Sequence, residues 1–266
     1  MFSAITCLGM PPRIIIDTRE PRPMLSIAFT FYPTLDLEHL ERSIYSLSRQ
    51  TALDRVGELV FVDNNTDFTE DQIRDVVEPY FQEPFVDYHF LKHGDSTRQE
   101  CWSANYAIEH CENERYVYTH GDLILTEDAI EKMDDACVGN ALVTGWIYLL
   151  NHPMAEQTMD DPPSYDDFDW RENTRNLLAY PVSKEFKDAV LAPTLYICTR
   201  SAWDAAGRYD EAMVHWGVQQ SVFLRHLQRQ GTRIVEIPES LCFHMEHPAD
   251  RDAKRAMAEY LSSRGG

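Results

Sequence analysis

The hydrophobic residues in the first half of the chain occur in short continuous runs, and each run is followed by a segment with helical periodicity. The runs predict strands over residues 24–31, 58–62, 85–91 and 115–119. Between them, helices are predicted to begin after the capping residues Asp36 and Ser96, with a shorter one over Gln72–Glu78. Strands that are apolar throughout and alternate with helices are typical of a parallel sheet covered on both faces. We therefore predict an α/β fold with a Rossmann-like, mostly parallel sheet.

The second half of the chain is less regular. Its hydrophobic runs predict strands over residues 141–150, 195–199 and 234–237. A short helix capped by Ser201 and a longer one over Val218–Gln230 are each ended by a glycine. Residues 151–187 combine proline, aspartate and aromatic residues. A connection of that length is either a binding loop or lid, or a solvated acidic loop.

The composition indicates a folded protein. Of its 266 residues, 44% are hydrophobic, which is too many for a disordered chain. We expect a lead segment over residues 1–22, a single domain over 23–248 and a helical tail over 249–266. The longest apolar run, residues 141–150, is too short to span a bilayer. Six scattered cysteines without a CxxC pair indicate reduced thiols, so we expect a cytoplasmic protein with no transmembrane segment.

Polar residues follow two of the predicted strands at their carboxyl ends, where parallel sheets bind their ligands. Asp63 follows the second strand, and His120-Gly121-Asp122 follows the fourth. A carboxylate and an imidazole two residues apart can face one cation or one sugar phosphate; a plain turn is the alternative reading. Thr126 then predicts a helix cap, with Glu127 and Asp128 in the first turn. The net charge of −20 opposes nucleic-acid and anionic membrane binding, but not a nucleotide whose phosphates a metal ion neutralises.

Four blocks of residues, taken in order, resemble the GT-A-fold glycosyltransferases, especially their large family two, from Met24 to His247. The C-terminal half is also similar to the retaining polypeptide N-acetylgalactosaminyltransferases. The blocks are Leu47-Ser48-Arg49-Gln50-Thr51, Leu59 to Asp67, Ser103 to Ile108 with His120-Gly121-Asp122, and Gly207 to Glu211 with Trp216-Gly217, Arg225, Gly231 and His244. The resemblance implies the GT-A fold and the binding of a nucleotide-diphosphate sugar, with UDP- or GDP-sugar as donor.

The resemblance also implies a divalent metal ion, which neutralises the charge of the departing diphosphate in metal-dependent members. Asp122 and His244 take the positions of its ligands. His120 replaces the first aspartate of the family's DxD triplet and would either bind the metal or contact the ribose. Mixed nitrogen and oxygen ligands suit Mn²⁺ better than Mg²⁺, which stays an alternative. His247 has no assigned role.

The donor nucleotide would be held at the ends of the first strands. By resemblance, Asp63 would accept a hydrogen bond from the base, and Asn65 would help to bind the ribose. Arg98 is either a phosphate contact or a solvated side chain. By resemblance, Thr30 and Tyr32, at the end of the first strand, would line the base pocket. His120 and Gly121 are also expected in the nucleotide-sugar site.

The sequence departs from the family where inverting members carry their general base, just after a Trp-Gly pair. Here Trp216 and its glycine are followed by Val218 and Gln219, and a glutamine cannot accept the acceptor's proton. Three interpretations stay open: a retaining reaction, a base from elsewhere such as Asp210 or Glu211, or loss of transfer activity. The catalytic candidates are therefore Asp210, Glu211, Trp216 and Gln219.

The residue patterns discriminate among three functions. A metal-dependent glycosyltransferase fits all four blocks. A catalytically inactive nucleotide-sugar-binding protein on the same fold is the alternative, supported by the glutamines at 219 and 220. A sugar nucleotidyltransferase would need a glycine-rich phosphate loop after the first strand, where Tyr32-Pro33-Thr34 stands instead. The acceptor stays open among a glycan, a lipid-linked sugar, a protein side chain and a modified nucleic-acid base.

Overall fold

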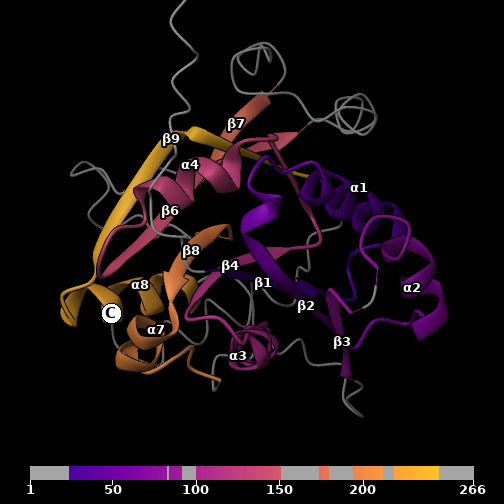
Figure 1. Cartoon of the computed structure of the whole chain (residues 1–266), viewed down its shortest axis with the longest axis horizontal. Helices are drawn as coiled ribbons and strands as arrows, with labels where there is room; N and C mark the ends of the chain where they lie inside the picture. The colour runs from indigo at the N-terminus through magenta and orange to yellow at the C-terminus, as the bar shows by residue number, and fades with distance from the viewer. Residues whose placement is uncertain are drawn as a thin grey trace, which may run out of the picture.

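The computed structural model describes residues 24–82, 84–91, 100–150, 174–179, 194–211 and 219–245, with the backbone alone for 148–150, 174–179 and 219–221. The predicted lead segment, the tail and most of the acidic stretch lie outside these residues. Within them, nine strands form one sheet with helices packed against it (Figure 1). None of the helices in this part of the chain has the length and apolar composition needed to cross a lipid bilayer.

Four parallel strands, in the order β3-β2-β1-β4, form the half of the sheet that comes first in the chain. Their bounds are Val86–Leu91, Val56–Asn64, Leu25–Phe31 and Arg115–His120. Every residue of β1 is buried, as expected for a central strand with helices on both sides. The register pairs Phe31 with Asp63 and Thr30 with His120. The candidate residues that follow β1, β2 and β4 therefore share one edge of the sheet.

The later strands extend this sheet in mixed directions. β8 (Tyr196–Thr199) pairs antiparallel with β4, and β6 (Ala141–Leu150) pairs antiparallel with β8. β9 (Arg233–His244) runs parallel to β6. The short strand β5 (Leu123–Leu125) pairs antiparallel with β9, and β7 (Thr174–Ala179) with β6. The predicted α/β fold is confirmed, with its run of parallel strands in the first half and a strand, β7, inside the segment that was expected to be a loop.

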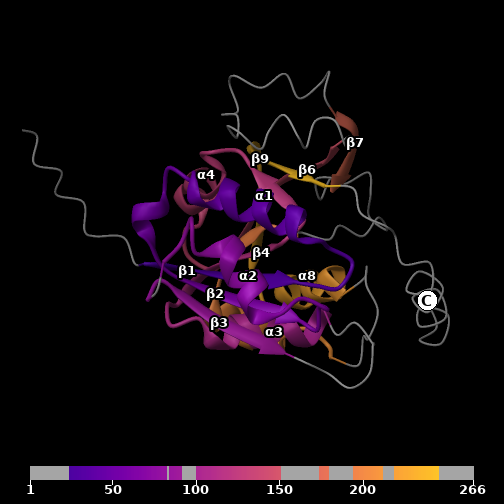
Figure 2. The same cartoon turned by 90° about the vertical axis from the view of Figure 1, so that its right-hand side faces the viewer.

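Helices cover both faces of the sheet, and each face has its own hydrophobic core (Figure 2). A short 3₁₀ turn, η1 (Leu53–Arg55), leads into β2. The helices that share the first core are α1 (Leu37–Ser48), α2 (Glu70–Val77) and α4 (Ala129–Ala136). Those that share the second core are α3 (Glu100–His110), α7 (Arg200–Ala206) and α8 (Gln219–Arg229).

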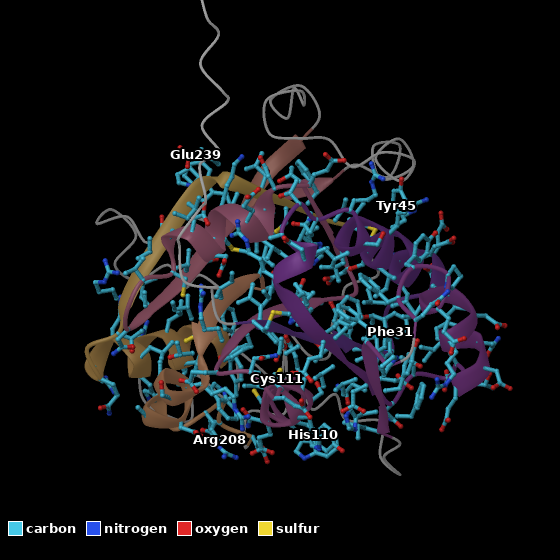
Figure 3. All side chains as sticks on the ribbon, viewed as in Figure 1. Phe31, Tyr45, His110, Cys111, Arg208 and Glu239 are labelled. Atoms are coloured by element: carbon cyan, nitrogen blue, oxygen red, sulfur yellow. The ribbon has the colours of Figure 1, made fainter. Side chains whose placement is uncertain are left out.

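The alternation of side chains along β1 separates the two cores. Ile27, Phe29 and Phe31 belong to the core under α1, α2 and α4, whereas Ala28 belongs to the core under α3. Phe31 lies in the interior of the molecule (Figure 3). Both faces of the central strand are therefore sealed from water, and only its carboxyl end can contribute to a ligand site.

The helix caps agree with the sequence at one position and differ at two. Asp36 accepts a hydrogen bond from the backbone N–H of His39, as predicted. The prediction for Thr126 is wrong: its hydroxyl donates to the Leu241 carbonyl of β9, and α4 begins only at Ala129. The prediction for Ser201 is also wrong, because Thr199 caps α7. The predicted cap Ser96 lies outside the described residues.

Strand β9 makes a bulge where it passes β6. The register pairs Gly145 with Ile237 and then Trp146 with Leu241, so residues 238–240 have no partner in β6. A Cβ atom on Gly145 would stand 2.4 Å from the Ser240 carbonyl oxygen, which explains the glycine. Figure 3 shows Glu239 at the rim where the strand bends. The strand predicted over residues 234–237 is longer in the structure, where β9 continues past the bulge to His244.

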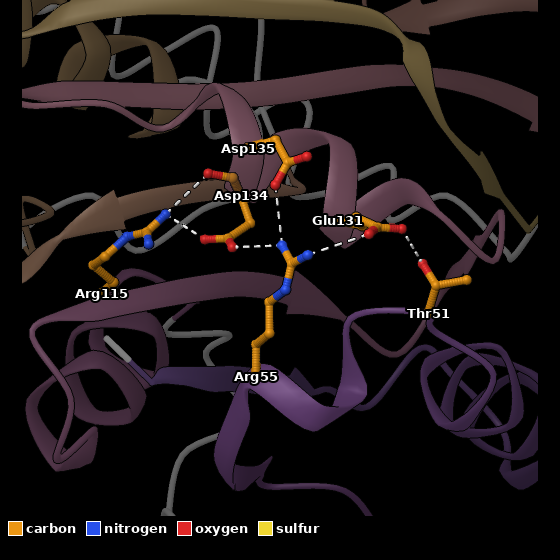
Figure 4. Close-up of polar contacts among 6 residues, drawn as sticks. All are labelled: Thr51, Arg55, Arg115, Glu131, Asp134 and Asp135. Carbon is orange, nitrogen blue, oxygen red and sulfur yellow. Dashed lines mark hydrogen bonds and ion pairs between the residues drawn. The ribbon is translucent and has the colours of Figure 1, made fainter. Parts of the chain in front are cut away.

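A cluster of charged residues ties α4 to the amino-terminal ends of the parallel strands (Figure 4). Asp134 is buried and forms ion pairs with Arg55, at 3.1 Å, and with Arg115. Arg55 also reaches Glu131 at 3.2 Å and Asp135 at 3.0 Å. This cluster lies at the amino-terminal edge of β2 and β4, opposite the edge that carries the candidate site.

Candidate functional site

The pairing of β5 with β9 brings the two predicted metal ligands together. Leu123, the first residue of β5, is in register with His244, the last residue of β9. The N–H of Met245 donates to the carbonyl of Asp122 at 2.8 Å, which extends the ladder by one step. Asp122 and His244 are far apart in sequence, and this ladder holds their backbones side by side.

Their side chains are in direct contact. His244 Nε2 lies 3.1 Å from Asp122 Oδ2, and both residues are buried. Burial opposes a charged imidazole and would lower the pKa of His244. The charge of Asp122 and its hydrogen bond outweigh that effect and raise the pKa of His244 above its ordinary value. The structure thus places these two residues side by side, and their role as metal ligands stays a prediction.

Tyr32, the residue that follows β1, contacts the same Asp122 carboxylate. Its hydroxyl donates a hydrogen bond to Asp122 Oδ2. Burial, followed by the negative charge of Asp122, raises the pKa of Tyr32 well above its ordinary value, so the hydroxyl keeps its proton and acts as a donor. The sequence analysis placed Tyr32 in the base pocket, and its contact with Asp122 was not foreseen.

His120 faces a different set of partners. It is fully buried, and its Nε2 lies 2.8 Å from the Tyr118 hydroxyl and 3.7 Å from Glu100 Oε1 of α3. Tyr32 meets the His120 ring edge-on, at 5.8 Å between ring centroids. Glu100 is itself buried and was missed by the sequence analysis, because a glutamate at the start of a helix is usually solvated. The role of His120 as a metal or ribose ligand stays a prediction.

Gly121 separates these two polar residues and is required by packing. Its N–H donates to the Thr30 carbonyl at 3.0 Å. A Cβ atom at this position would stand 2.8 Å from Phe31 Cδ2 and 3.3 Å from Leu35 Cδ1. Packing in the core thus explains why position 121 is a glycine. The role of Gly121 in donor binding stays a prediction.

We expect Gly121→Ala to lower the free energy of unfolding by about 1–3 kcal/mol, because the added methyl group overpacks a core that is already full. Urea titration followed by circular dichroism measures the change. Gly139→Ala is an informative comparison: its Cβ would meet nothing within 4 Å, and its positive φ of 66° is the only obstacle to a side chain. An unchanged midpoint for Gly121→Ala would contradict the packing argument.

The predicted nucleotide residues lie at the ends of β1 and β2. Asp63 is fully buried, and its Oδ1 accepts a hydrogen bond from the N–H of Thr66 at 3.0 Å. Asn65 adopts a left-handed conformation with φ of 62°, which turns the chain directly after the strand. Thr30 is buried, with its hydroxyl 3.4 Å from that of Tyr118. The site residues that end β1, β2 and β4 thus share one edge of the sheet.

The predicted catalytic residues are only partly described. Glu211 is exposed, and its carboxylate accepts a hydrogen bond from Asn105 of α3 at 2.9 Å. Asp210 is half-buried. Gln219 is the first residue of α8, and only its backbone is described. The catalytic candidate Trp216 and the phosphate-contact candidate Arg98 lie outside the described residues. So does His247, to which no role was assigned.

The donor atoms of Asp122 and His244 fit a divalent cation. Neighbouring ligands of an octahedral ion with bonds of about 2.1 Å stand about 3 Å apart, and the two atoms here are separated by 3.1 Å. Among the described residues no group of three or more His, Cys, Asp or Glu side chains is placed to hold an ion. A two-residue site of this kind suits an ion that takes its remaining ligands from water and substrate phosphates.

Comparison with known proteins gives structural matches alone. The chain matches no protein-family model and no curated protein. The structure of GalNAc-T7 with UDP, GalNAc and Mn²⁺ is similar with a TM-score of 0.62 and 12% identity, over 85% of this chain and 44% of that one. The mannosyltransferase PcManGT from Pyrobaculum calidifontis, in complex with GDP-Man and Mn²⁺, is similar with a TM-score of 0.56 and 15% identity, over 92% of this chain and 65% of that one.

The chain thus spans less than two thirds of either protein. Both are GT-A glycosyltransferases, and both were solved with Mn²⁺ and a nucleotide or nucleotide sugar. At such low identity the likeness concerns the arrangement of the strands and helices. The chain has the GT-A fold of the glycosyltransferases.

Proposed function

We propose that this protein is a metal-dependent glycosyltransferase that uses a nucleoside-diphosphate sugar as donor. The observation that carries the proposal is the contact of 3.1 Å between Asp122 and His244. It stands at the sheet edge where ligands of α/β folds bind. Two structures of the same fold contain Mn²⁺ with UDP or GDP-mannose, which supports a metal and a donor of this class.

Asp122 and His244 are the residues that would hold the metal, with Mn²⁺ preferred over Mg²⁺ because one ligand is an imidazole. The metal would neutralise charge on the diphosphate as it leaves. Asp63 would accept a hydrogen bond from the base, and Asn65 would contact the ribose. These residues would thus position the donor at the carboxyl ends of β1, β2 and β4.

Proton removal from the acceptor has two candidate routes. Asp210 and Glu211 are the carboxylates nearest to the family pattern, and Asn105 holds Glu211 in place. Alternatively, the departing phosphate oxygen accepts the proton in a retaining reaction, so that no protein base is needed. The acceptor itself is not specified by any described residue, and the acidic aromatic stretch 151–187 is proposed to border it.

The proposed function is tested by a thermal-shift panel of UDP, GDP and their sugars, each with and without Mn²⁺. A ligand that binds the native state raises the melting temperature by mass action. We expect one nucleotide to raise the melting temperature, and to raise it much more when Mn²⁺ is present. Incubation of that donor with candidate acceptors then distinguishes transfer from simple binding. No stabilisation by any nucleotide with Mn²⁺ would refute the proposal.

We expect Asp63→Asn to weaken binding of the selected nucleotide by about 10- to 100-fold, since a hydrogen bond to a charged group contributes roughly 1.5–3 kcal/mol. Asparagine keeps the oxygen that accepts from the Thr66 N–H, so the turn after β2 is preserved. Isothermal titration calorimetry measures the affinity. Asp87→Asn, at an exposed position of the neighbouring strand β3, is the matched control. Equal affinity in Asp63→Asn and wild type would remove Asp63 from the base site.

A further inference from the structure

The tyrosine at the end of β1 stands apart from the other predicted base-pocket residues, because its hydroxyl is directed at the Asp122 carboxylate. We propose that Tyr32 is a positioning residue that holds Asp122 in the orientation needed to bind the metal. This inference rests on the proposed function, since it assigns Tyr32 to the metal site rather than to the nucleotide base.

The first support is the convergence of two donors on one oxygen atom. Tyr32 Oη and His244 Nε2 both contact Asp122 Oδ2; Tyr32 directly follows β1, and His244 ends β9. When His244 turns its Nε2 to a cation, it can no longer donate a hydrogen bond to that oxygen. The hydrogen bond from Tyr32 does not depend on that exchange, and so it keeps the carboxylate in place.

The second support is the rigidity of Tyr32 itself. Its side chain is 5% exposed, and its ring packs edge-on against His120 at an interplanar angle of 89°. The backbone after Tyr32 makes a turn in which the Leu35 N–H donates to the Tyr32 carbonyl at 3.0 Å. A donor that is already fixed in the unliganded site reduces the entropy lost when a ligand side chain is ordered. Hydrogen-bonding partners of metal ligands act in this way in other proteins.

The alternative is that Tyr32 lines the base pocket, as the sequence suggested. A tyrosine that stacks on a base would act through its ring, and its replacement by phenylalanine would leave most of that contact intact. A tyrosine that positions Asp122 acts through its hydroxyl, and the same replacement removes the whole effect. Tyr32→Phe therefore separates the two roles. It should lower the Mn²⁺ affinity if Tyr32 positions Asp122, and change little if the ring stacks on the base.

The experiment is a Mn²⁺ titration of the full chain, followed by electron paramagnetic resonance of the free ion, first with the metal alone and then with the nucleotide selected by the thermal-shift panel. We expect Tyr32→Phe to weaken Mn²⁺ binding by about 10- to 100-fold, with the metal-free nucleotide affinity unchanged. The matched control is Tyr196→Phe, which removes another buried hydroxyl, 2.8 Å from that of Tyr209, on strand β8. This control should lose stability but keep the Mn²⁺ affinity of wild type.

The outcomes separate the two proposals. If wild type binds Mn²⁺ and Tyr32→Phe binds it equally well, the positioning role is wrong and the proposed function stands. If Tyr32→Phe instead weakens metal-free nucleotide binding and leaves the Mn²⁺ affinity unchanged, the hydroxyl contacts the nucleotide and the positioning role is again wrong. If wild type binds no Mn²⁺ with or without nucleotide, both proposals fail. A loss of Mn²⁺ affinity in Tyr196→Phe as large as in Tyr32→Phe would show a general effect of stability and overturn the assignment.

Discussion

Replacing Asp122 by asparagine is expected to abolish Mn²⁺-dependent donor binding and to reduce sugar transfer by orders of magnitude. Asparagine keeps an oxygen for the Tyr32 hydroxyl but loses the negative charge that faces His244. Loss of a partner that only supports a metal ligand costs about 10- to 100-fold in affinity, so loss of the ligand itself should exceed roughly 100-fold. Calorimetric titration with Mn²⁺ measures the affinity, and donor hydrolysis measures the activity.

His244→Ala should reproduce this loss, because it removes the second of the two proposed ligands. The matched control is His89→Ala, which also removes an imidazole in contact with an aspartate, at 2.8 Å from Asp87 on the edge strand β3. That variant should bind Mn²⁺ as wild type does. If Asp122→Asn or His244→Ala retained full metal affinity, the ion would have to bind elsewhere and the proposed site would be wrong.

Asp134→Ala should cause a large loss of stability, although the residue lies outside the candidate site. This carboxylate is buried between Arg55 and Arg115, so its removal leaves two guanidinium groups facing each other without their shared anion. Breaking a buried pair in this way costs roughly 3–5 kcal/mol. Urea unfolding at equilibrium measures it as a shift of the midpoint with an unchanged slope.

Asp135→Ala provides the comparison within the same cluster. Asp135 contacts the same Arg55 at 3.0 Å, but its side chain is 52% exposed. Solvent-exposed ion pairs contribute about 0–1 kcal/mol, so the second variant should remain close to wild type. Equal midpoints for the two variants would mean that burial does not determine the strength of this cluster.

The first half of the fold could be predicted from the sequence because each element carries its own local signal. β1 and β2 are continuous apolar runs, and Asp36 caps α1 by contacting a backbone group three residues away. Such signals need no knowledge of distant residues. The resemblance to the GT-A fold rested on the same local blocks, and the structural matches confirm it.

The errors arose where a distant residue decided the local structure. Threonine is a common helix cap, but the hydroxyl of Thr126 donates its hydrogen bond to the carbonyl of Leu241 instead. The same strand β9 supplies His244 to Asp122, a pairing that only the family resemblance suggested. Glu100 and the contact of Tyr32 carried no local signal, because each depends on where another element packs.

The origin of β9 late in the chain also bears on how the protein is made. Synthesis runs from the amino terminus, and the four parallel strands β1 to β4 need only residues up to His120. The partner of Asp122 comes from the last residue of β9, and pairings between distant segments form slowly. The proposed metal site would therefore be completed last, and a chain that stops short of residue 244 would lack one of its two proposed ligands.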